Sequence, residues 1–284
     1  MTIQEALIDG RNKLALSSSP RLDARLLLEY VLQQNHTYLV AHAEEHLLFC
    51  QETFYFSKLE EAARSMPIPY LTGIAPFFGR DYIVSPAVLI PRPETELLVE
   101  AALGWLEQRV NQKDRLFIVD VGFGSGCIAI SLAHLFPSGH IEATDISPAA
   151  LDIARRNAEA HGVAQQINFR HGPLLEPVTG KIDLIIANLP YVADDEWTLL
   201  DDGVKWFEPD LALKGGSDGL ELIRQLLNEA KLRLMPGGAI FLEIGWRQGS
   251  AVQDMAGSIF PGAQVKVSPD LSGLDRLVEI TNAN

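Results

Sequence analysis

An apolar run, Leu116–Val121, leads directly into a loop with three alternating glycines, Gly122, Gly124 and Gly126. Such a run predicts a buried strand, and the segment after the loop, Cys127–Phe136, is expected to form a short helix. Glycines at a strand–loop–helix junction let the backbone turn tightly and let a ligand come within contact distance. This feature favours an α/β fold with a ligand site beside the loop.

From about residue 114 onward, short apolar segments alternate with helical ones. After the first strand, further strands are expected at 141–144, 167–170, 184–187, 239–244, 265–267 and 277–280, and further helices at 147–162 and 220–234. Apolar strands separated by helices are typical of a parallel sheet that is covered on both faces. We therefore predict a Rossmann-like sheet for this part of the chain.

Residues 1–66 have a different pattern, in which apolar side chains recur at helical spacing, as in Leu22, Leu26 and Leu27. Residues 66–93 are rich in proline, and we expect a hairpin there with strands at 77–80 and 82–84. The predicted organisation is therefore a helical domain (1–74), a hairpin linker (75–93) and the α/β domain (94–284).

Composition limits the function. The 284 residues include 23 Lys and Arg against 37 Asp and Glu, a net charge of −14, which argues against broad binding to a phosphate backbone. The two cysteines, Cys50 and Cys127, cannot build a disulfide framework. No apolar run reaches the ~18 residues needed to span a bilayer, and the polar start is not that of a signal or transit peptide. We expect a reducing, cytoplasmic setting.

The glycine loop has a particular chemistry. Its G-x-G-x-G spacing differs from the G-x-G-x-x-G of dinucleotide enzymes, and it lacks the Lys-Ser/Thr of a P-loop. Asp120 beside it would repel a pyrophosphate but tolerate a ligand carrying an ammonium and a sulfonium. Asp145 ends the second expected strand, where an acid can bind both hydroxyls of a ribose. The pattern favours a nucleoside-bearing cofactor; the alternative is a tight strand–helix turn with a capping Asp.

A second polar loop, Asn188-Leu189-Pro190-Tyr191, follows the expected strand 184–187. The amide oxygen of Asn188 accepts hydrogen bonds. Since Pro190 has no N–H, the Leu189 carbonyl can face a ligand as a second acceptor. Two converging acceptors suit a planar –NH₂ group, whose π face Tyr191 could cover. The alternative is a plain Asx turn.

Taken in order, these motifs resemble those of S-adenosylmethionine-dependent amino methyltransferases. Three further stretches narrow the resemblance: Leu22–Leu28, Ile68–Gly73 together with Leu89–Glu96, and Glu208–Leu220. Together they resemble the protein-(glutamine-N5) methyltransferases of the HemK/PrmC family over nearly the whole chain. The run Arg92-Pro-Glu-Thr-Glu96 is less similar to the sister family that methylates a ribosomal protein.

The resemblance implies a seven-stranded class I methyltransferase sheet and a small N-terminal helical domain that docks the substrate. It implies S-adenosyl-L-methionine as cofactor, S-adenosyl-L-homocysteine as product, and the GGQ glutamine of peptide chain release factors as the methylated residue. The implied cofactor-binding residues are Asp120, Gly122, Phe123, Gly124, Ser125, Gly126, Asp145, Pro173 and Asn188. The implied catalytic and substrate-binding residues are Asn188, Leu189, Pro190 and Tyr191.

The implied reaction displaces a methyl group from a sulfonium to an amide nitrogen. That nitrogen is a poor nucleophile because its lone pair is delocalised into the carbonyl, so the two acceptors would orient it and stabilise its developing positive charge. The sequence departs from the family in two places. Leu189 replaces the first proline of the usual Asn-Pro-Pro-Tyr, and His171–Leu174 lacks the acid often found near the adenine.

Other functions remain as alternatives. A nucleic-acid exocyclic-amine methyltransferase would use the same Asn-x-Pro-aromatic turn, and the sister activity on a ribosomal-protein glutamine would use the same chemistry. A dehydrogenase fits the glycine spacing poorly, and a non-catalytic binding module is conceivable because of Leu189. His42–His46 matches a zinc-protease pattern without a third ligand, so no metal is expected. We expect a monomer that binds neither nucleic acid nor membranes directly.

Overall fold

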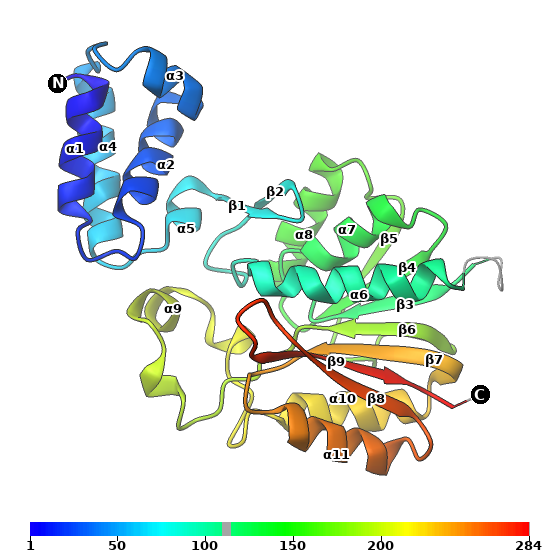
Figure 1. Cartoon of the computed structure of the whole chain (residues 1–284). Helices are drawn as coiled ribbons and strands as arrows, with labels where there is room; N and C mark the ends of the chain where they lie inside the picture. The colour runs from blue at the N-terminus through cyan, green and yellow to red at the C-terminus, as the bar shows by residue number, and fades with distance from the viewer. Residues whose placement is uncertain (110–114, 284) are drawn as a thin grey trace. The chain divides into compact units, whose positions relative to one another are not determined.

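The computed structural model describes residues 1–109 and 115–283, and the chain divides into two compact units (Figure 1). The first unit comprises Met1–Ile74 and Asp201–Phe207, and the second comprises Ala75–Leu200 and Glu208–Asn284. In this division the hairpin region, residues 75–93, belongs to the second unit. Within the described residues, no helix is long and apolar enough to cross a lipid bilayer.

The first unit is helical, as the spacing of its apolar residues predicts. Its helices are α1 (Ile3–Lys13), α2 (Pro20–Leu32), α3 (His36–Ala41), α4 (Phe49–Ala63), α5 (Ile68–Thr72) and α9 (Asp202–Phe207). Thr2 and Glu5 form a capping box that satisfies backbone N–H groups at the start of α1. The apolar faces of α1, α2 and α4 share one core, in which Leu27, Tyr55 and Leu59 are fully buried.

Tyr55 places a phenol inside this core. Its hydroxyl donates a hydrogen bond to the Ala24 carbonyl of α2 at 3.1 Å, which satisfies the only polar atom of the side chain. The hydroxyl lies directly against Gly10 of α1, where a Cβ would overlap it. The lack of a side chain at Gly10 therefore lets the three helices pack closely.

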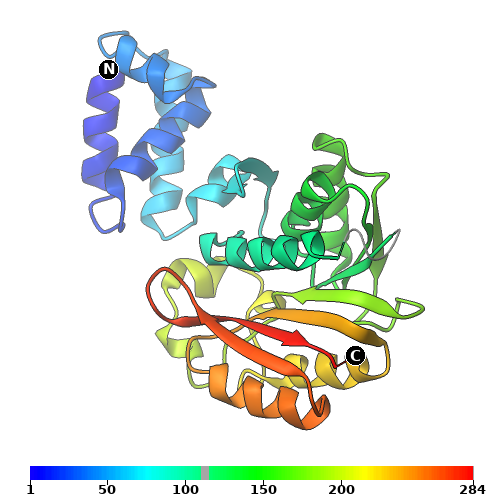
Figure 2. The same ribbon diagram turned by 45° about the vertical axis from the view of Figure 1, so that its right-hand side comes forward.

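The second unit is built on a seven-stranded sheet, which confirms the predicted class I methyltransferase fold (Figure 2). Its strands are β3 (Phe117–Val121), β4 (His140–Asp145), β5 (Ile167–His171), β6 (Ile182–Ala187), β7 (Leu234–Glu243), β8 (Gln264–Pro269) and β9 (Asp275–Thr281). Their order is β5-β4-β3-β6-β7-β9-β8, in which β9 alone runs antiparallel to its two neighbours.

Helices cover both faces of the sheet. On one face lie α6 (Glu96–Glu107), α7 (Cys127–Leu135) and α8 (Pro148–Ala160), and on the other lie α10 (Glu221–Lys231) and α11 (Gly249–Ile259) (Figure 1). Short 3₁₀ turns occur at Pro93–Thr95, Trp197–Leu199 and Asp210–Ala212. Every residue of β6 is buried, as expected for a central parallel strand.

The hairpin and strand β7 differ from the sequence expectation. The hairpin consists of β1 (Ile74–Phe77) and β2 (Arg80–Ile83), so Phe78 and Gly79 form its turn instead of extending the first strand. Both turn residues have positive φ, 49° and 71°, which strand geometry excludes. In β7 the strand starts at Leu234, and Pro236–Gly238 lies within it at an irregularity in the register with β6. Such a bulge tolerates proline in a strand.

The order of the strands determines where a ligand can bind. The chain runs from β3 outward to β4 and β5, and then returns to the other side of β3 with β6 and β7. At such a reversal, the loops after neighbouring parallel strands diverge and leave a crevice at the carboxyl edge. The polar residues at this edge include Asp145, which ends β4, Asn188, which follows β6, and Glu243, which ends β7.

We expect Gly10→Ala to destabilise the protein by about 1–3 kcal/mol, because the added methyl group overpacks the Tyr55 hydroxyl. The measurement is urea unfolding followed by circular dichroism. Gly104→Ala in α6 is the matched control, since a Cβ there meets nothing within 4 Å, and it should be neutral or stabilising by up to about 1 kcal/mol. Equal effects of the two substitutions would contradict this account of the helical core.

Candidate active site

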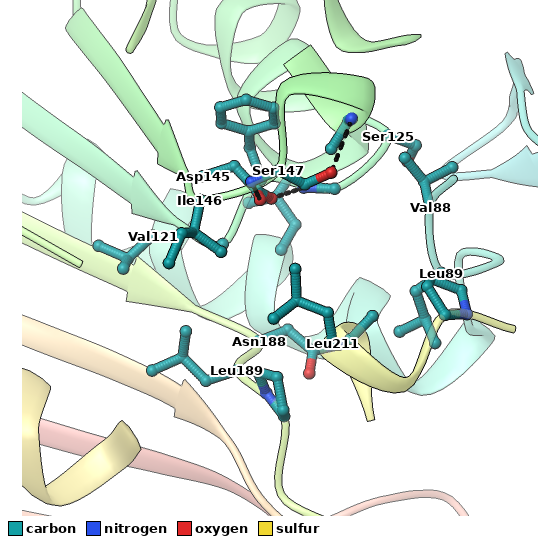
Figure 3. Close-up of a pocket in the computed structure, with 18 of the residues that line it drawn as sticks. Val88, Leu89, Val121, Ser125, Asp145, Ile146, Ser147, Asn188, Leu189 and Leu211 are labelled. Carbon is teal, nitrogen blue, oxygen red and sulfur yellow. Dashed lines mark hydrogen bonds between the residues drawn. The ribbon is translucent and has the colours of Figure 1, made fainter. Parts of the chain in front are cut away.

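A cavity of about 210 Å³ lies at the carboxyl edge of the sheet, within the second unit. Its walls come from the glycine loop, the ends of β4 and β6, and two segments from elsewhere in the chain, residues 87–95 and 209–212. Figure 3 shows Asp145 and Ser147 on one side of the cavity and Asn188, Leu189 and Leu211 on the opposite side, with Val88 and Leu89 at a third. The two predicted polar loops therefore face one cavity.

The glycine loop is held against β4 by its backbone. The N–H groups of Gly122 and Phe123 both donate to the Thr144 carbonyl, at 2.8 and 3.2 Å. Gly122 has φ +79°, and a Cβ there would lie 3.2 Å from Leu189 Cδ2. Glycine is therefore required at this position both by conformation and by the close approach of the loop that follows β6.

Asn157 of α8 supports the glycine loop from behind. Its side-chain nitrogen donates to the Ser125 carbonyl at 2.8 Å and to the Ile83 carbonyl at 3.0 Å, and its oxygen accepts from the Ile83 N–H at 2.7 Å. The buried amide thus joins the hairpin to the loop with all its contacts satisfied by backbone groups. Sequence reasoning did not identify Asn157, because nothing in a helical stripe distinguishes a buried Asn from an exposed one.

Asp145 lines the cavity, as predicted for an acid that binds a ribose. Its two oxygens accept backbone hydrogen bonds from Gly124 at 2.9 Å and from Ser147 at 2.8 Å (Figure 3). Burial raises the pKa of this carboxyl, against the effect of these two donors. Each carboxylate oxygen retains a further lone pair, so the group can accept hydrogen bonds from a ligand as well as shape the loop.

Asp120 lies behind the wall of the cavity, where its side chain cannot touch a ligand. It lies in β3 beneath the glycine loop, is fully buried, and is absent from the described cavity lining. Its Oδ2 accepts from the Ala129 N–H at 3.1 Å, while its Oδ1 has no hydrogen-bond partner among the described residues. Burial raises the pKa of Asp120 to about 7. Any effect of Asp120 on a ligand is therefore electrostatic and indirect.

Asn188 is held by a neighbour that sequence reasoning did not identify. Its Nδ2 donates to the hydroxyl of Thr95 at 3.1 Å, and both residues line the cavity. Its Oδ1 has no hydrogen-bond partner in the part of the chain that the structure describes. The amide is therefore anchored by its nitrogen and retains an acceptor oxygen, which is the arrangement expected for a group that receives a ligand N–H.

The rest of the Asn188–Tyr191 loop divides into two parts. Leu189 and Pro190 line the cavity, and the Leu189 side chain is 5% exposed and belongs to the apolar core. Tyr191 is absent from the described lining. Its hydroxyl donates to Glu243 at 3.4 Å, and its carbonyl accepts from Gln248 at 2.9 Å. In this state, Tyr191 contributes to the support of the loop from outside the cavity.

Phe123 and Pro173, two of the remaining predicted residues, belong to an apolar part of the wall, whereas Gly126 is absent from the described lining. Phe123 is 2% exposed and makes an edge-to-face contact with Phe169, with ring centroids 5.2 Å apart. Pro173 lines the cavity beside Leu174, together with Ser125. Cys127 also lies at this wall, and burial raises the pKa of its thiol to about 12, so it is a packing residue rather than a nucleophile.

Two segments of the family-like sequence meet above the cavity. Glu208 is buried, and its carboxylate accepts from the Ile90 N–H at 3.1 Å and pairs with the Arg92 guanidinium. Truncating Arg92 would leave the buried charge of Glu208 without its ion-pair partner. The contact holds the proline-rich segment against the 209–212 turn, and the two together close one side of the cavity.

The missed residues left some signal in the sequence. Glu243 ends an apolar strand in the same way as Asp145, so the rule that ligands bind at the carboxyl edge could have indicated it. Thr95 and Glu208 lie in stretches that resemble the family. Their partners, however, are 148 and 118 positions away in the chain, and a single sequence cannot pair such residues.

Each of the two units contains a match to a known protein family. Residues 5–73 match the family model described as PrmC N-terminal domain, and residues 97–203 match the methyltransferase small domain. The first match covers most of the helical unit. The second covers the glycine loop, Asp145 and the Asn188–Tyr191 loop, which are the parts of the cavity wall that the sequence predicted.

Curated relatives match the chain over nearly its full length. It is 40% identical to a release factor glutamine methyltransferase of Moorella thermoacetica, with 97% of each chain covered, and 39% identical to one of Koribacter versatilis, with 98% of each covered. Among solved structures, the ribosomal protein L11 methylase of Lactobacillus delbrueckii subsp. bulgaricus aligns with a TM-score of 0.50 at 22% identity, covering 74% of this chain and 90% of that one. The structural match establishes the fold alone.

The buried Asp120 predicts a specific pH dependence of stability. Its pKa is raised in the folded state, from 3.8 to about 7, so deprotonation opposes folding. The group's contribution to stability is present below about pH 4 and is lost as the pH rises towards 7. In Asp120→Asn this loss is absent, so the unfolding free energy of the variant relative to wild type should increase by up to about 4 kcal/mol over that range.

Denaturant unfolding of both proteins at stepwise pH, without added ligand, measures this difference. The absolute effect of the substitution cancels because only the change with pH is compared. A difference that stays flat between pH 4 and 7 would show that Asp120 does not titrate in this way.

Proposed function

This chain belongs to the release factor glutamine methyltransferase family, and from that membership we propose how its cavity works: Asn188 and the Leu189 carbonyl hold the substrate amide beside an S-adenosyl-L-methionine bound over the glycine loop. The enzyme methylates a glutamine of release factors, and we assign the methylated atom as the N5 nitrogen of the glutamine in their GGQ motif. The observation that carries this proposal is the Asn188 amide at the cavity wall, which is anchored through its nitrogen and whose oxygen has no hydrogen-bond partner within residues 1–109 and 115–283.

The donor set of the cavity fits this cofactor. Asp145 offers carboxylate acceptors for the two ribose hydroxyls, and Phe123, Pro173 and Leu174 offer an apolar surface for the adenine. The glycine loop has no side chain at Gly122 or Gly124 to keep a ligand away. When Asp120 beneath the loop is ionised, its carboxylate, whose Oδ1 has no hydrogen-bond partner among the described residues, adds negative potential that favours a cation. When bound, S-adenosyl-L-methionine supplies an electrophilic methyl group on its sulfonium sulfur and becomes S-adenosyl-L-homocysteine.

The residues of the chain act on the glutamine amide. Asn188 Oδ1 and the Leu189 carbonyl each accept one N–H, which fixes the direction of the nitrogen and restricts its rotation. As the nitrogen gains positive charge, the two acceptors stabilise it more strongly than they stabilise the neutral amide. The proton released from the nitrogen passes to water, so this role requires no strong base.

Leu189 keeps this acceptor although it replaces the usual proline. Its carbonyl is retained, and its side chain packs against Gly122 and the core, so burial of the side chain holds the loop where a fixed φ would otherwise do so. Pro190 remains, which leaves no N–H after the Leu189 carbonyl. We propose Tyr191 as a supporting residue that covers the substrate amide when the substrate is bound.

We assign substrate docking to the N-terminal helical domain, residues 1–74, with the hairpin of residues 75–93 joining it to the methyltransferase domain of residues 94–284. The match of residues 5–73 to the PrmC N-terminal domain supports this assignment. We propose that the enzyme acts as a monomer in the cytoplasm, where release factors act in translation termination, and that it contacts the protein rather than nucleic acid.

The central experiment uses methyl-labelled S-adenosyl-L-methionine and four potential substrates in parallel: a release factor, the same factor with the GGQ glutamine replaced by alanine, ribosomal proteins, and nucleic acid. The label is located by peptide mass spectrometry. Label on the GGQ glutamine that is lost in the alanine control supports the proposal. Label only on a ribosomal protein or on nucleic acid would overturn it in favour of that substrate.

Asn188→Ala should lower kcat by about 100-fold or more, because the substrate nitrogen loses an acceptor that fixes its direction. The dissociation constant for S-adenosyl-L-methionine, measured by calorimetry, should change much less. Asn228→Ala on the exposed surface of α10 removes the same kind of side chain and serves as the control. Near-normal turnover of Asn188→Ala at saturating cofactor would rule out this role.

Asp145→Ala should weaken binding of S-adenosyl-L-methionine by about tenfold or more, because a ligand hydroxyl would lose a charged acceptor. Turnover at saturating cofactor should fall less than affinity does. Asp152→Ala on the exposed face of α8 is the matched control. Unchanged affinity in Asp145→Ala would mean that the cofactor does not use this carboxylate.

A further inference from the structure

A chain of buried hydrogen bonds continues behind Asn188. The Asn188 Nδ2 donates to Thr95 Oγ1 at 3.1 Å, and the Thr95 hydroxyl donates to Glu243 Oε2 at 2.6 Å. Thr95 and Glu243 are each 3% exposed. The three residues come from three distant segments, namely the loop after β6, the turn before α6 and the end of β7, so only the folded sheet brings them together.

The direction of this chain follows from the proton inventory. A carboxylate only accepts hydrogen bonds, and a threonine hydroxyl has one proton. Because the Thr95 hydroxyl uses its one proton in the hydrogen bond to Glu243, its oxygen can only accept a hydrogen bond from Asn188. The amide must then turn its nitrogen towards Thr95 and its oxygen towards the cavity. The two ends of an asparagine amide have nearly the same shape, so packing alone would not distinguish them.

Two hydroxyl donors support Glu243 as an acceptor, against the effect of burial, which favours its protonated form. The Tyr191 hydroxyl donates to Glu243 Oε1 at 3.4 Å, and Arg276 reaches the Tyr191 oxygen at 3.5 Å and the Ile244 carbonyl at 3.1 Å. Burial raises the pKa of Glu243, and nearby Glu94 adds to this, whereas Thr95, Arg276 and Tyr191 act in the opposite direction. Both carboxylate oxygens therefore have a hydroxyl donor, as a buried acceptor requires.

We propose that Thr95 and Glu243 are positioning residues that set the direction of the Asn188 amide and thereby make the site select a side-chain amide over a carboxylate. This inference rests on the proposed function. With Asn188 Oδ1 and the Leu189 carbonyl both facing the substrate, an –NH₂ group finds two acceptors, whereas a carboxylate in the same place meets two oxygens and is repelled. Reversal of the Asn188 amide would instead present a donor and remove this discrimination.

Three variants test the direction of the hydrogen bonds. Thr95→Val keeps the shape of the side chain and removes the hydroxyl, so kcat should fall by about 10- to 100-fold. Thr95→Ser retains the hydroxyl and should stay within about threefold of wild type, since the hydrogen-bonding group is unchanged. In Glu243→Gln, the new amide can donate a hydrogen bond to the Thr95 oxygen. The Thr95 hydroxyl can then donate to Asn188 Oδ1, which would reverse the direction of the Asn188 amide. All three should bind S-adenosyl-L-methionine with nearly wild-type affinity.

Selectivity provides a readout that a merely structural role would not change. The competitor is a release factor with the GGQ glutamine replaced by glutamate, measured as an inhibitor of methylation of the unaltered factor. We compare the inhibition constant of this competitor with the KM of the glutamine substrate. In Glu243→Gln, the ratio of inhibition constant to KM should be about tenfold lower than in wild type, because the glutamate factor binds relatively better. Wild type should favour glutamine.

The outcomes separate this inference from the function on which it rests. If wild type does not methylate the GGQ glutamine, the proposed function fails. If wild type does so but Thr95→Ser is as impaired as Thr95→Val, or Glu243→Gln weakens binding of both factors and the cofactor in parallel, the network only stabilises the fold and this inference is wrong. Wild-type kinetics in both Thr95→Val and Glu243→Gln would also overturn it.

Discussion

The contact between Leu189 and Gly122 depends on two central parallel strands, β3 and β6, that end side by side. Because Gly122 has no Cβ, the loop after β6 can lie against the loop after β3. This approach brings the acceptors of the Asn188–Tyr191 loop to the same cavity as the glycine loop. A larger residue at Gly122 would separate the two loops, and neither of them contains a complete site.

Buried polar groups then tie distant segments to this pair of strands. Glu243 accepts a hydrogen bond from Thr95, and Glu208 accepts one from Ile90 and pairs with Arg92. Asn157 accepts a hydrogen bond from the Ile83 N–H of the hairpin. Burying a charge is costly unless it is paired or hydrogen-bonded, so each contact is strongly specified once it forms. The proline-rich segment is thereby part of the active-site wall, although it precedes the first strand of the sheet.

The run of residues from Pro93 to Glu96 illustrates how different the roles of adjacent residues are. Thr95 turns into the cavity wall and holds Asn188, while Glu96 faces the hairpin and accepts from the Phe78 N–H at 2.7 Å. The resemblance to a family indicates that the run matters, but not what each residue does. Those separate roles depend on side-chain directions, which differ from one residue to the next along the 3₁₀ turn and the start of α6.

Local chemistry made much of the fold predictable. The strand–glycine–helix junction, the apolar strands and the helix expected from residue 147 are all short-range patterns, and the structure has them where the sequence indicated. Ser147 caps that helix by accepting from the Ala150 N–H at 3.2 Å. One error arose where pairing in the sheet overrides local preference, and the other arose from a turn that the sequence reading did not recognise. Pro236–Gly238 is drawn into β7 by its neighbours in the sheet, and Phe78 is placed in a turn by its left-handed backbone.

The site itself divides in the same way. The sequence by itself determined which residue types stand at the ends of the central strands: the glycines, Asp145 and Asn188. The tertiary structure alone decided that Asp120 is buried below the loop, that Tyr191 faces Glu243, and that Thr95 anchors Asn188. The reason is physical: strand ends and turns are set by neighbours in the chain, whereas burial is set by packing, and the hydrogen-bond partners of Tyr191 and Asn188 lie 52 and 93 positions away.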